Sequence, residues 1–489
     1  MSGSIMMAVA AALAAGGCSD SGTGTGGTGP NPTPACGGGS TVIQGPITQS
    51  CTLTAGQTYT LKGYVKVQNG ATLTIQPGTR IVGDLATPGS SLWILRGAKL
   101  IAEGTAQQPI VFTSAAPVGS RKPGDWGGIV IIGNGVINRT ANPVLTEGGA
   151  AGQAENYAGG TNNADNSGSL KYVRIEFAGY DISNGAGQEL NSLSSYAVGN
   201  GTRYEYIQTL AGLDDSFEFF GGAVDARYLV SYESGDDHWD TTEGYVGRLQ
   251  FFIALQSTRL TPNPGAGTLS SDPRGFEADG CDPSPTAAPD CVYQGGSATP
   301  TGMNTPYSLP IVSNFTVIGP RNLVPGFPTD GNGAVLRRGT GYMLNNGIIA
   351  GWPGRGINGR DFWTDSLRLR DSLSITNIIF AENGSNYDPE GSTSASDRFW
   401  PSKFATSGHR TVSSIAQLVT SVTGPNFDWR PPAGSPAATG GSAVVPPRLA
   451  ARVAGYPYSG GWQTTTYVGA VAPGDPNPWY SGWTTYATN

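Results

Sequence analysis

Residues Gly201–Gly222 (GTRYEYIQTLAGLDDSFEFFGG) are followed directly by Ala223–Gly244 (AVDARYLVSYESGDDHWDTTEG), a second version of the same pattern. The two segments align without a gap at a period of 22 residues. Each consists of short β runs separated by turn residues, and neither shows the spacing of an amphipathic helix. Self-similarity at this period is typical of a solenoid, in which each repeat packs on its neighbours. We therefore expect an all-β chain folded as a parallel β-helix, with one coil for each repeat.

A third copy of the pattern, Tyr245–Ala266, keeps the apolar strand but loses the acidic residues. In the ungapped alignment, Phe251 falls in the column of Leu229. Arg259 falls in the column of Asp237. Strand parity should bury the first of these columns. The second column should place the Arg259 side chain beside the acidic residues.

Two further families of repeats extend the solenoid in both directions. Val65–Gly78 and Leu92–Gly104 align at a period of 27 residues. Short β runs that begin at Asn314, Asn346 and Asn377 recur at a looser period of 31–32 residues. Identical side chains that stack along an axis can hydrogen-bond to one another, so we expect these asparagines to be structural. The coils should therefore hold about 22–32 residues each, with long loops between some strands.

Composition narrows the possible functions. Glycine supplies 74 of 489 residues and charged residues only 13%, which favours a β-solenoid with frequent turns over a helical bundle. The net charge of −7 provides no basic patch, so nucleic acid is not expected as a partner. Because the chain has only His238 and His409, a multi-histidine zinc site is not expected either.

The N-terminal sequence indicates export. Residues 1–18 contain a short apolar run and end in Ala-Gly-Gly-Cys, which resembles a lipobox with Cys18 as the lipidated residue. Residues 19–40 are a tether rich in Gly, Ser, Thr and Pro. We assign the β-helix to 41–445 and a C-terminal capping segment to 446–489. The expected location is the outer membrane or the cell surface, or release from it, with membrane contact through the lipid anchor only.

The other four cysteines form two local pairs. Cys36 and Cys51 flank the start of the predicted helix, and Cys281 and Cys291 enclose a Pro-rich loop. Disulfides are stable in exported proteins, and a loop of about 15 residues closed in this way gains roughly 3 kcal/mol of stability. We therefore predict the disulfides Cys36–Cys51 and Cys281–Cys291.

Several motifs together resemble a known family. They are Leu73-Thr-Ile-Gln-Pro-Gly, Gly104-Thr-Ala-Gln-Gln-Pro-Ile-Val-Phe-Thr-Ser, Trp126-Gly-Gly-Ile, Asp214-Asp-Ser-Phe-Glu, Asn314-Phe-Thr-Val-Ile-Gly and Tyr467-Val-Gly-Ala. The chain resembles large bacterial surface lipoproteins with a single-stranded, right-handed parallel β-helix. The resemblance implies fold and location and carries no particular chemistry. At the level of the fold the chain also looks like pectate lyases and polygalacturonases, which is an analogy only.

Acidic residues recur in the same columns of the two repeats. Stacked coils lie about 4.8 Å apart, so each carboxylate should lie directly above another and repel it. Sites with several carboxylates are those that Ca²⁺ selects, and no organic cofactor is expected. The alternative is a solvated acidic face. The candidate metal ligands are Asp214, Asp215, Glu218, Asp236, Asp237, Asp240 and Glu243.

The same coils also permit a catalytic interpretation. A glycosidase needs two carboxylates, about 5–5.5 Å apart in retaining enzymes, and Asp215 and Asp237 should lie close to that spacing. Alternatively, Arg259 could act as a base beside a bound Ca²⁺, as the analogy with pectate lyases implies. A simpler interpretation is that Arg259 closes the acidic column with a salt bridge.

His238 and Trp239 lie next to the acids and are candidates for ligand binding. An exposed Trp can stack on a sugar ring, whereas aromatic columns inside a β-helix belong to its core. Strand parity does not settle which way Phe217 and Trp239 point. Two further charged groups, Arg274–Asp279 and Leu336–Arg338, could extend a groove across coils or form ordinary surface pairs.

Two functions from different classes remain. The first is a Ca²⁺-stabilised β-helix at the cell surface that binds glycans or other surface partners. The second is a polysaccharide lyase or glycoside hydrolase that uses the acidic coils, residues 214–243. The absence of a complete catalytic signature in the sequence favours the first function. The oligomeric state stays open.

The lipobox-like ending leads to a direct prediction. We expect Cys18→Ala to release the protein from the membrane fraction, because the cysteine thiol is the attachment point of the lipid. Membrane fractionation and mass spectrometry of the N-terminal peptide measure this, with Cys36→Ala as the control that keeps the anchor. Equal membrane retention of Cys18→Ala and the wild type would contradict lipidation.

Overall fold

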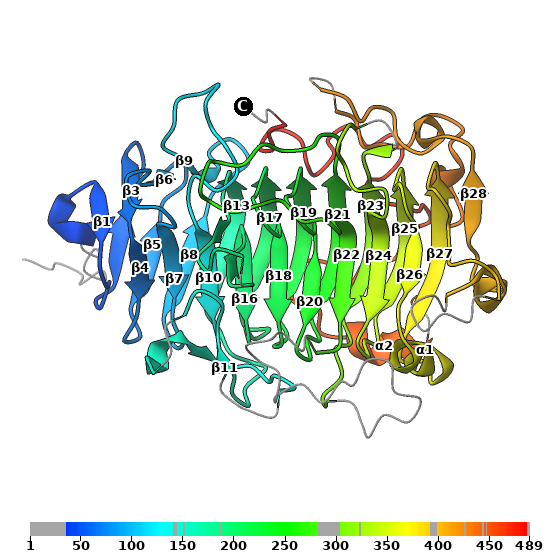
Figure 1. Cartoon of the computed structure of the whole chain (residues 1–489), viewed down its shortest axis with the longest axis horizontal. Coiled ribbons are helices and arrows are strands. Elements are labelled where there is room, and N and C mark those ends of the chain that lie inside the picture. Colours follow the sequence, from blue (N-terminus) through cyan, green and yellow to red (C-terminus); the bar gives the residue numbers. More distant parts are fainter. Residues whose placement is uncertain are drawn as a thin grey trace, which may run out of the picture. The chain divides into compact units, whose positions relative to one another are not determined.

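Short strands recur in every coil and stack in parallel along the helix axis into two main sheets (Figure 1). The computed structural model describes residues 36–139, 144–149, 152–185, 187–281, 304–321, 324–391, 399–424, 427–442, 445 and 447–486. All of them belong to one unit, Pro34–Asn489. The predicted lipidation site Cys18 lies outside the described residues.

Sheet A has 15 strands. Its main path is β1 (Val42–Gln44), β3 (Thr58–Lys62), β6 (Arg80–Gly83), β9 (Ile110–Ser114), β13 (Gly168–Glu176), β17 (Arg203–Leu210), β19 (Asp225–Tyr232), β21 (Arg248–Leu255), β23 (Ile311–Ile318), β25 (Met343–Ala350), β27 (Ser374–Ala381) and β28 (Arg410–Val412). A side branch holds β2 (Cys51–Leu53), β5 (Thr72–Ile75) and β8 (Lys99–Glu103).

Sheet B has nine strands. They are β4 (Tyr64–Val67), β7 (Ser91–Ile94), β10 (Gly128–Ile132), β16 (Leu193–Tyr196), β18 (Phe217–Phe220), β20 (Asp240–Thr242), β22 (Arg274–Asp279), β24 (Asn332–Arg337) and β26 (Ile357–Gly359). Two small hairpins lie in the loops, formed by β11 (Val144–Leu145) with β12 (Tyr157–Ala158) and by β14 (Tyr180–Asp181) with β15 (Glu189–Leu190).

Helices are few among the described residues. The α-helices are α1 (Phe362–Leu369) and α2 (Pro447–Val453), and short 3₁₀ turns are η1 (Cys36–Gly39), η2 (Ala154–Asn156), η4 (Pro401–Phe404), η5 (Ile415–Gln417) and η6 (Pro436–Ala438). None of the helices in the described ranges combines the length and the apolar character needed to cross a membrane. The predicted all-β parallel β-helix is confirmed.

Two short strands of the early coils fuse into one long strand at β13. The first half of β13 pairs with β8, and its second half pairs with β9. The residue between the halves, Tyr172, has a positive φ of 49° and is skipped in the pairing. It therefore marks the corner where the side branch of sheet A meets the main path.

Every later coil repeats this corner with one residue at positive φ. The residues in this corner column are Tyr172, Tyr206, Tyr228, Phe251, Asn314, Asn346 and Asn377, with φ between 49° and 66°. Asparagine tolerates this left-handed region because its short side chain can hydrogen-bond locally. The Asn377 side-chain amide donates to the Asn346 side chain, which confirms the predicted structural role of these two asparagines.

The core lies inside the coils, where Ile207 stacks on Leu229 and both are fully buried. The expected register of the third copy is wrong by one residue, because Leu229 pairs with Phe252 rather than with Phe251. The coil between them is one residue longer than the 22-residue repeat. Phe251 instead occupies the corner column, where its ring stacks on Tyr228 at 5.1 Å.

The described part of the C-terminal segment packs against sheet A rather than over the end of the last coil, where the expected cap would lie. It runs back along the outside of sheet A, seen as the red trace in Figure 1. The backbone of Gly469 donates to Asn346, and further on Thr485 donates to Gln208. The segment packs there because the outer faces of the later sheet A strands are apolar, and Val468 and Trp483 bury them.

The cysteines at the described positions 36, 51 and 281 are in disulfide bonds. Cys36 and Cys51 form the predicted disulfide, with Cα atoms 4.9 Å apart, and so join the first 3₁₀ turn to β2. Cys281 is also disulfide-bonded. Its predicted partner, Cys291, lies outside the described residues.

Candidate functional site

A column of polar side chains runs across the turns that precede the sheet B strands. In this column Asn191, Asp215, Asp237 and Arg274 lie one above the other in successive coils. The side-chain oxygen of each of the first three accepts a hydrogen bond from the backbone N–H of the next member of the column, one coil further on, at 3.0, 2.8 and 2.6 Å. The two aspartates therefore hold neighbouring coils in register, which is a structural role beyond charge.

A glycine brings the acidic turns this close together. A Cβ atom on Gly235 would lie 1.7 Å from the carbonyl oxygen of Leu213 in the preceding coil. No side chain fits at that distance, so only glycine allows the turn before Asp236 to pack on the turn before Asp214. The repeat of the Asp-Asp pair thus brings its carboxylates into one site.

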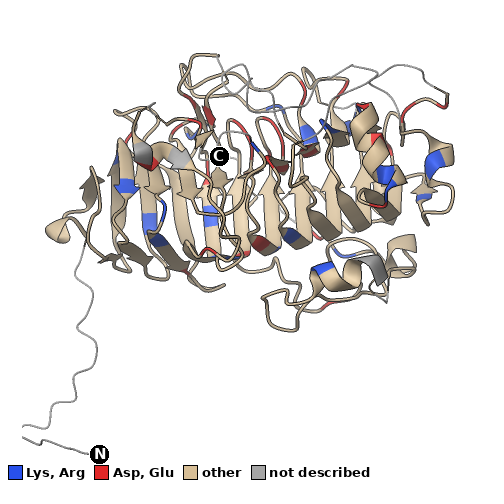
Figure 2. Ribbon diagram, turned by 90° about the horizontal axis from the view of Figure 1, so that it is seen from below, with Lys and Arg blue, Asp and Glu red and all other residues tan. Residues whose placement is uncertain are grey.

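The acidic turns line a pocket of about 400 Å³. Ten acidic side chains and three arginines surround it, although charged residues are only 13% of the chain and sparse along the ribbon (Figure 2). The acidic residues are Glu147, Glu189, Asp214, Asp215, Glu218, Asp236, Asp237, Asp240, Glu277 and Asp279. We call this feature the acidic pocket.

One end of the acidic pocket contains only acids. Carboxylate oxygens of Asp214, Asp215 and Asp236 lie within 4.8 Å of one another, as do those of Asp215, Glu218 and Asp240. The Oδ1 atoms of Asp236 and Asp240 are buried and have no hydrogen-bond partner among the described residues. Buried carboxylate oxygens without partners are costly, so this end fits a bound cation.

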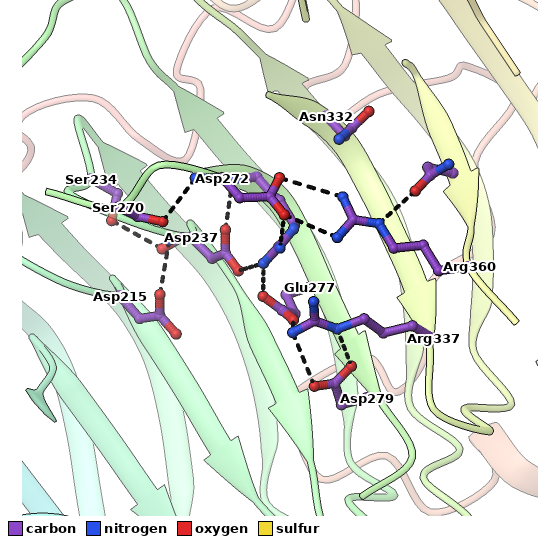
Figure 3. A network of polar contacts seen from close by, with 12 residues as sticks. Asp215, Ser234, Asp237, Ser270, Asp272, Glu277, Asp279, Asn332, Arg337 and Arg360 are labelled. Atoms are coloured by element: carbon purple, nitrogen blue, oxygen red, sulfur yellow. Dashed lines mark hydrogen bonds and ion pairs between the residues drawn. The ribbon is translucent and has the colours of Figure 1, made fainter. Parts of the chain in front are cut away.

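Arginines neutralise the other end of the acidic pocket (Figure 3). Arg274 pairs with Asp237 at 3.1 Å and also contacts Asp272 and Glu277. Arg337 contacts Glu277 and pairs with Asp279 at 2.7 Å. The charged groups predicted at Arg274–Asp279 and Leu336–Arg338 do extend the site across coils. Their ion pairs join the buried residues Arg274, Glu277 and Asp279 to the partly exposed Arg337 and Arg338.

Burial raises the pKa values of the carboxyl groups in the acidic pocket, and neighbouring charges make the rise differ from group to group. It raises the pKa of Asp215 well above its ordinary value, and the charge of Asp237 adds to this shift. Burial acts in the same direction on the pKa values of Glu218 and Asp240. Burial raises the pKa of Asp237 only to about 6, because the charge of Arg274 opposes the shift. Burial and mutual repulsion therefore favour the protonated form of the carboxyls at the acids-only end, whereas Arg274 favours the ionised form of Asp237.

The comparisons with known proteins agree with this fold. A family described as a pectate-lyase-like β-helix domain matches residues 45–417. The chain belongs to this family. No match is found among curated proteins. Among solved structures, the chain is similar to the catalytic domain of a GH87 α-1,3-glucanase in complex with tetrasaccharides, at 11% identity and a TM-score of 0.29, over 80% of this chain and 69% of that one.

In this pectate-lyase-like β-helix, six of the seven predicted metal ligands line the acidic pocket, and the seventh, Glu243, does not. Glu243 lies outside the acidic pocket and pairs with Arg139, a residue of the loop after β10. It follows β20, whereas the turns that hold Asp214 and Asp236 precede their strands. The prediction of Glu243 as a metal ligand is therefore corrected.

Arg259 is also not in the acidic pocket. Because the third coil is longer than the alignment assumes, the column of Asp215 and Asp237 continues into Arg274 instead. The Arg259 guanidinium donates to the backbone of Ser270 at 3.0 Å. The salt bridge predicted to close the column is made by Arg274 instead, and Arg259 is not among the residues that line the pocket.

His238 and Trp239 are core residues rather than ligand-binding residues. Trp239 is fully buried and packs on Phe219 with ring centroids 4.4 Å apart. His238 is buried as well, and its Nδ1 lies 2.5 Å from the Ser231 hydroxyl. Burial lowers the pKa of His238 to about 3, so the imidazole is neutral. The predicted ligand contacts of both residues are therefore corrected.

Two acids of the pocket are absent from the sequence-based prediction. Glu147 lies beyond β11 and Glu189 begins β15, so both come from hairpins in the loops before the acidic coils. They have no repeat partner, and an alignment of coils has no signal for them. Their negative charge contributes to the raised pKa values of Glu218 and Asp214.

The carboxyl pKa values predict how stability depends on pH. The ordinary pKa is 3.8 for Asp and 4.5 for Glu, and the folded values of Asp214, Asp215, Glu218 and Asp240 lie well above these. Groups whose pKa rises on folding stabilise the fold below the unfolded pKa and lose that contribution as the pH rises through the folded pKa. With a chelator present, we expect the melting temperature to fall as the pH rises above the ordinary carboxyl values of 3.8 and 4.5.

The variant Asp215→Asn/Asp240→Asn tests the origin of this slope. It removes two of the charges, and the amide introduced by Asp215→Asn keeps an oxygen that can accept the hydrogen bond from Asp237. We expect a shallower pH dependence than that of the wild type, measured by thermal melting at fixed ionic strength. A wild-type melting temperature that rises with pH over the same range would contradict the assignment.

Proposed function

We propose that this protein is an exported β-helix, held at the cell surface by a lipid on Cys18, that binds glycans with the help of Ca²⁺ in the acidic pocket. The observation that carries the proposal is the acids-only end of the pocket, with its buried oxygens of Asp236 and Asp240 that have no partner among the described residues. Membership of the pectate-lyase-like β-helix family supports a carbohydrate-related function.

The chemistry of the donor set favours Ca²⁺. All the groups at the acids-only end are carboxylates on two stacked coils, and hard oxygen ligands in flexible number suit Ca²⁺ better than Zn²⁺. An ion would be held by Asp214, Asp215 and Asp236, or by Asp215, Glu218 and Asp240. When bound, Ca²⁺ supplies positive charge that lets these groups ionise and offers coordination sites to oxygens of a ligand.

A glycan would meet two kinds of group in this pocket. Ca²⁺ at one end can accept hydroxyl or carboxylate oxygens of a sugar. At the other end, Arg337 and Arg338 carry donors that suit carboxylates. Without the ion, the excess of acids would repel an anionic chain. The proposal therefore requires that binding of a uronate polymer depends on Ca²⁺.

A second candidate function is hydrolysis or lyase cleavage of a polysaccharide at the same pocket. Oxygens of Asp237, Asp240 and Glu277 lie within 4.8 Å of one another. Burial raises the pKa of Asp240 well above its ordinary value, whereas the charge of Arg274 holds the rise for Asp237 to about 6. A protonated and an ionised carboxyl side by side are the pair that a glycosidase uses. For a lyase, Arg337 is the better base than Arg259, because burial and Arg274 lower its pKa to about 9.

Calcium should stabilise the fold through the acidic pocket. At a hundred times its dissociation constant, an ion that binds only the folded state contributes about 2.7 kcal/mol. We expect the wild type to melt at a higher temperature in Ca²⁺ than in chelator, and Asp215→Asn/Asp240→Asn to lose most of that difference. Glu233→Gln, which changes a buried acid outside the pocket, is the matched control and should keep it. Equal melting of the wild type in both conditions would refute the calcium site.

A polysaccharide screen separates binding from catalysis. We expect polygalacturonate or alginate to bind in Ca²⁺ and to dissociate in chelator, without release of reducing ends or unsaturated products. Products that appear with the wild type but not with Asp237→Asn would establish the enzymatic alternative. Failure of every uronate polymer to bind in Ca²⁺, with no product from any polymer, would refute both functions of this pocket.

A further inference from the structure

A second pocket lies on sheet A, away from the acidic pocket on sheet B. It has a volume of about 500 Å³, within the range of about 300–1,000 Å³ typical of small-molecule sites. Its floor is formed by the aromatic half of the corner column, which is Tyr172, Tyr206, Tyr228 and Phe251. Its other side is formed by the C-terminal segment. We call it the aromatic pocket. The lining residues that matter are Tyr172, Tyr206, Tyr228, Asp475, Trp479 and Trp483.

The rings of the floor form a continuous stack. Centroid distances are 4.4 Å from Tyr172 to Tyr206 and 4.7 Å from Tyr206 to Tyr228, with planes 11° and 23° apart. Each tyrosine comes from a different coil and is held by its positive φ at the corner. The stack is therefore part of the rigid helix and is in place before any ligand arrives.

Two tryptophans of the C-terminal segment complete the pocket. The Trp483 ring meets Tyr206 edge-on at 6.0 Å, and the Trp479 ring lies 5.2 Å from Tyr228, tilted by 38°. Their indole N–H groups donate to the backbone carbonyls of Trp479 and Ala470, at 2.8 and 2.9 Å. Both rings are thus fixed by the segment itself, while the Trp479 side chain stays partly exposed.

On the asparagine half of the corner column, the residues from Gly440 onward bind the side chains directly, and Asn377 stays half-buried. The Asn314 side chain donates to Thr465 at 2.8 Å, and the Ser442 backbone donates to Asn346 at 2.9 Å. The space left beside Asn346 is about 10 Å³, against about 500 Å³ over the aromatic half. The segment therefore packs closely on the asparagines through direct hydrogen bonds and leaves a large opening over the rings.

The polar groups of the aromatic pocket exclude charged ligands. Among the described residues, Asp475 is the only charged member of its lining, so an anionic ligand would be repelled. A cation would need free ring faces, but the tyrosines cover one another, and the Arg227 guanidinium already lies 4.8 Å from the centre of the Tyr228 ring. What remains are ring edges, the partly exposed Trp479, and hydrogen-bonding groups of Gln463 and Asn477.

We propose that the aromatic pocket binds a neutral glycan, with a pyranose ring against Trp479 and its hydroxyls on the tyrosine, Asp475 and amide groups. Within the part of the chain that the structure describes, no hydrogen-bond partner reaches the hydroxyl of Tyr206, so it is available to a sugar hydroxyl. A sugar has apolar C–H faces and many hydroxyls, which matches this lining. The choice of ligand class deepens the proposed function, but the site needs neither Ca²⁺ nor the acidic pocket.

The test uses the full-length protein and a panel of neutral hexasaccharides: cello-, manno-, xylo- and α-1,3-gluco-oligosaccharides. Saturable quenching of tryptophan fluorescence reports binding, and melting curves verify that each variant is folded. We expect at least one member to bind equally well in Ca²⁺ and in chelator. Trp479→Ala should raise its Kd at least about tenfold, the factor that ~1.4 kcal/mol gives. Tyr206→Phe, which keeps the ring stack, should raise the Kd by a smaller factor.

Phe362→Ala, on the exposed surface of α1, is the matched aromatic control and should bind as the wild type does. If Trp479→Ala and Tyr206→Phe both bind with the Kd of the wild type, the assignment is overturned. The absence of binding across the panel at millimolar concentrations would overturn it as well. Competition by tetramethylammonium would show a cation site instead. Loss of binding in chelator would place the sugar in the acidic pocket, which distinguishes failure of this proposal from failure of the calcium-dependent function.

Discussion

Hydrogen bonding between successive coils is the constraint on which the rest of this molecule depends. Every coil must repeat the backbone path of its neighbour at about 4.8 Å, so any residue in a column meets its counterpart directly. The backbone ladders fix most of the register, and the column of Asn191, Asp215 and Asp237 adds side-chain oxygens that accept N–H groups from the following coil. A polar column of this kind stabilises the turns as well as the strands.

The same stacking has an electrostatic cost. Acids that repeat in register approach one another in a buried pocket, where charge is poorly screened. The structure resolves this in two ways along one pocket. Toward the later coils, Arg274 and Arg337 neutralise Asp237, Glu277 and Asp279. Toward the earlier coils the acids gather with one another, and the carboxyls either take up protons or bind a cation. This contrast separates an ordinary ion-pair network from a candidate binding site.

Corners of the coils create the second site. Fusion of two short strands at β13 leaves one residue per coil at positive φ, and the chain fills this position with aromatic rings in four coils and asparagines in three. The C-terminal segment then packs along the column. It hydrogen-bonds to the asparagines, whereas it contacts the rings only through Trp479 and Trp483 and leaves a pocket of about 500 Å³ beside them. A geometric requirement of the helix thus produces both a hydrogen-bonded seam and an open pocket.

The sequence by itself determined the fold, the positions of the acidic column and the Cys36–Cys51 pairing. These depend on local periodicity and short separations, which a repeat displays directly. Six acids of the pocket follow from the 22-residue register alone. Only the tertiary structure decided what surrounds them. Glu147 and Glu189 come from loops outside the repeat. Arg274 replaces Arg259 because a long loop follows β21, so that the residue paired with Asp240 is Glu277, 37 positions further on, and the 22-residue period gives no sign of this loop. The burial of Trp239 against Phe219 and the path of the C-terminal segment were likewise set by packing between residues of different coils, which the order of residues within one repeat does not show.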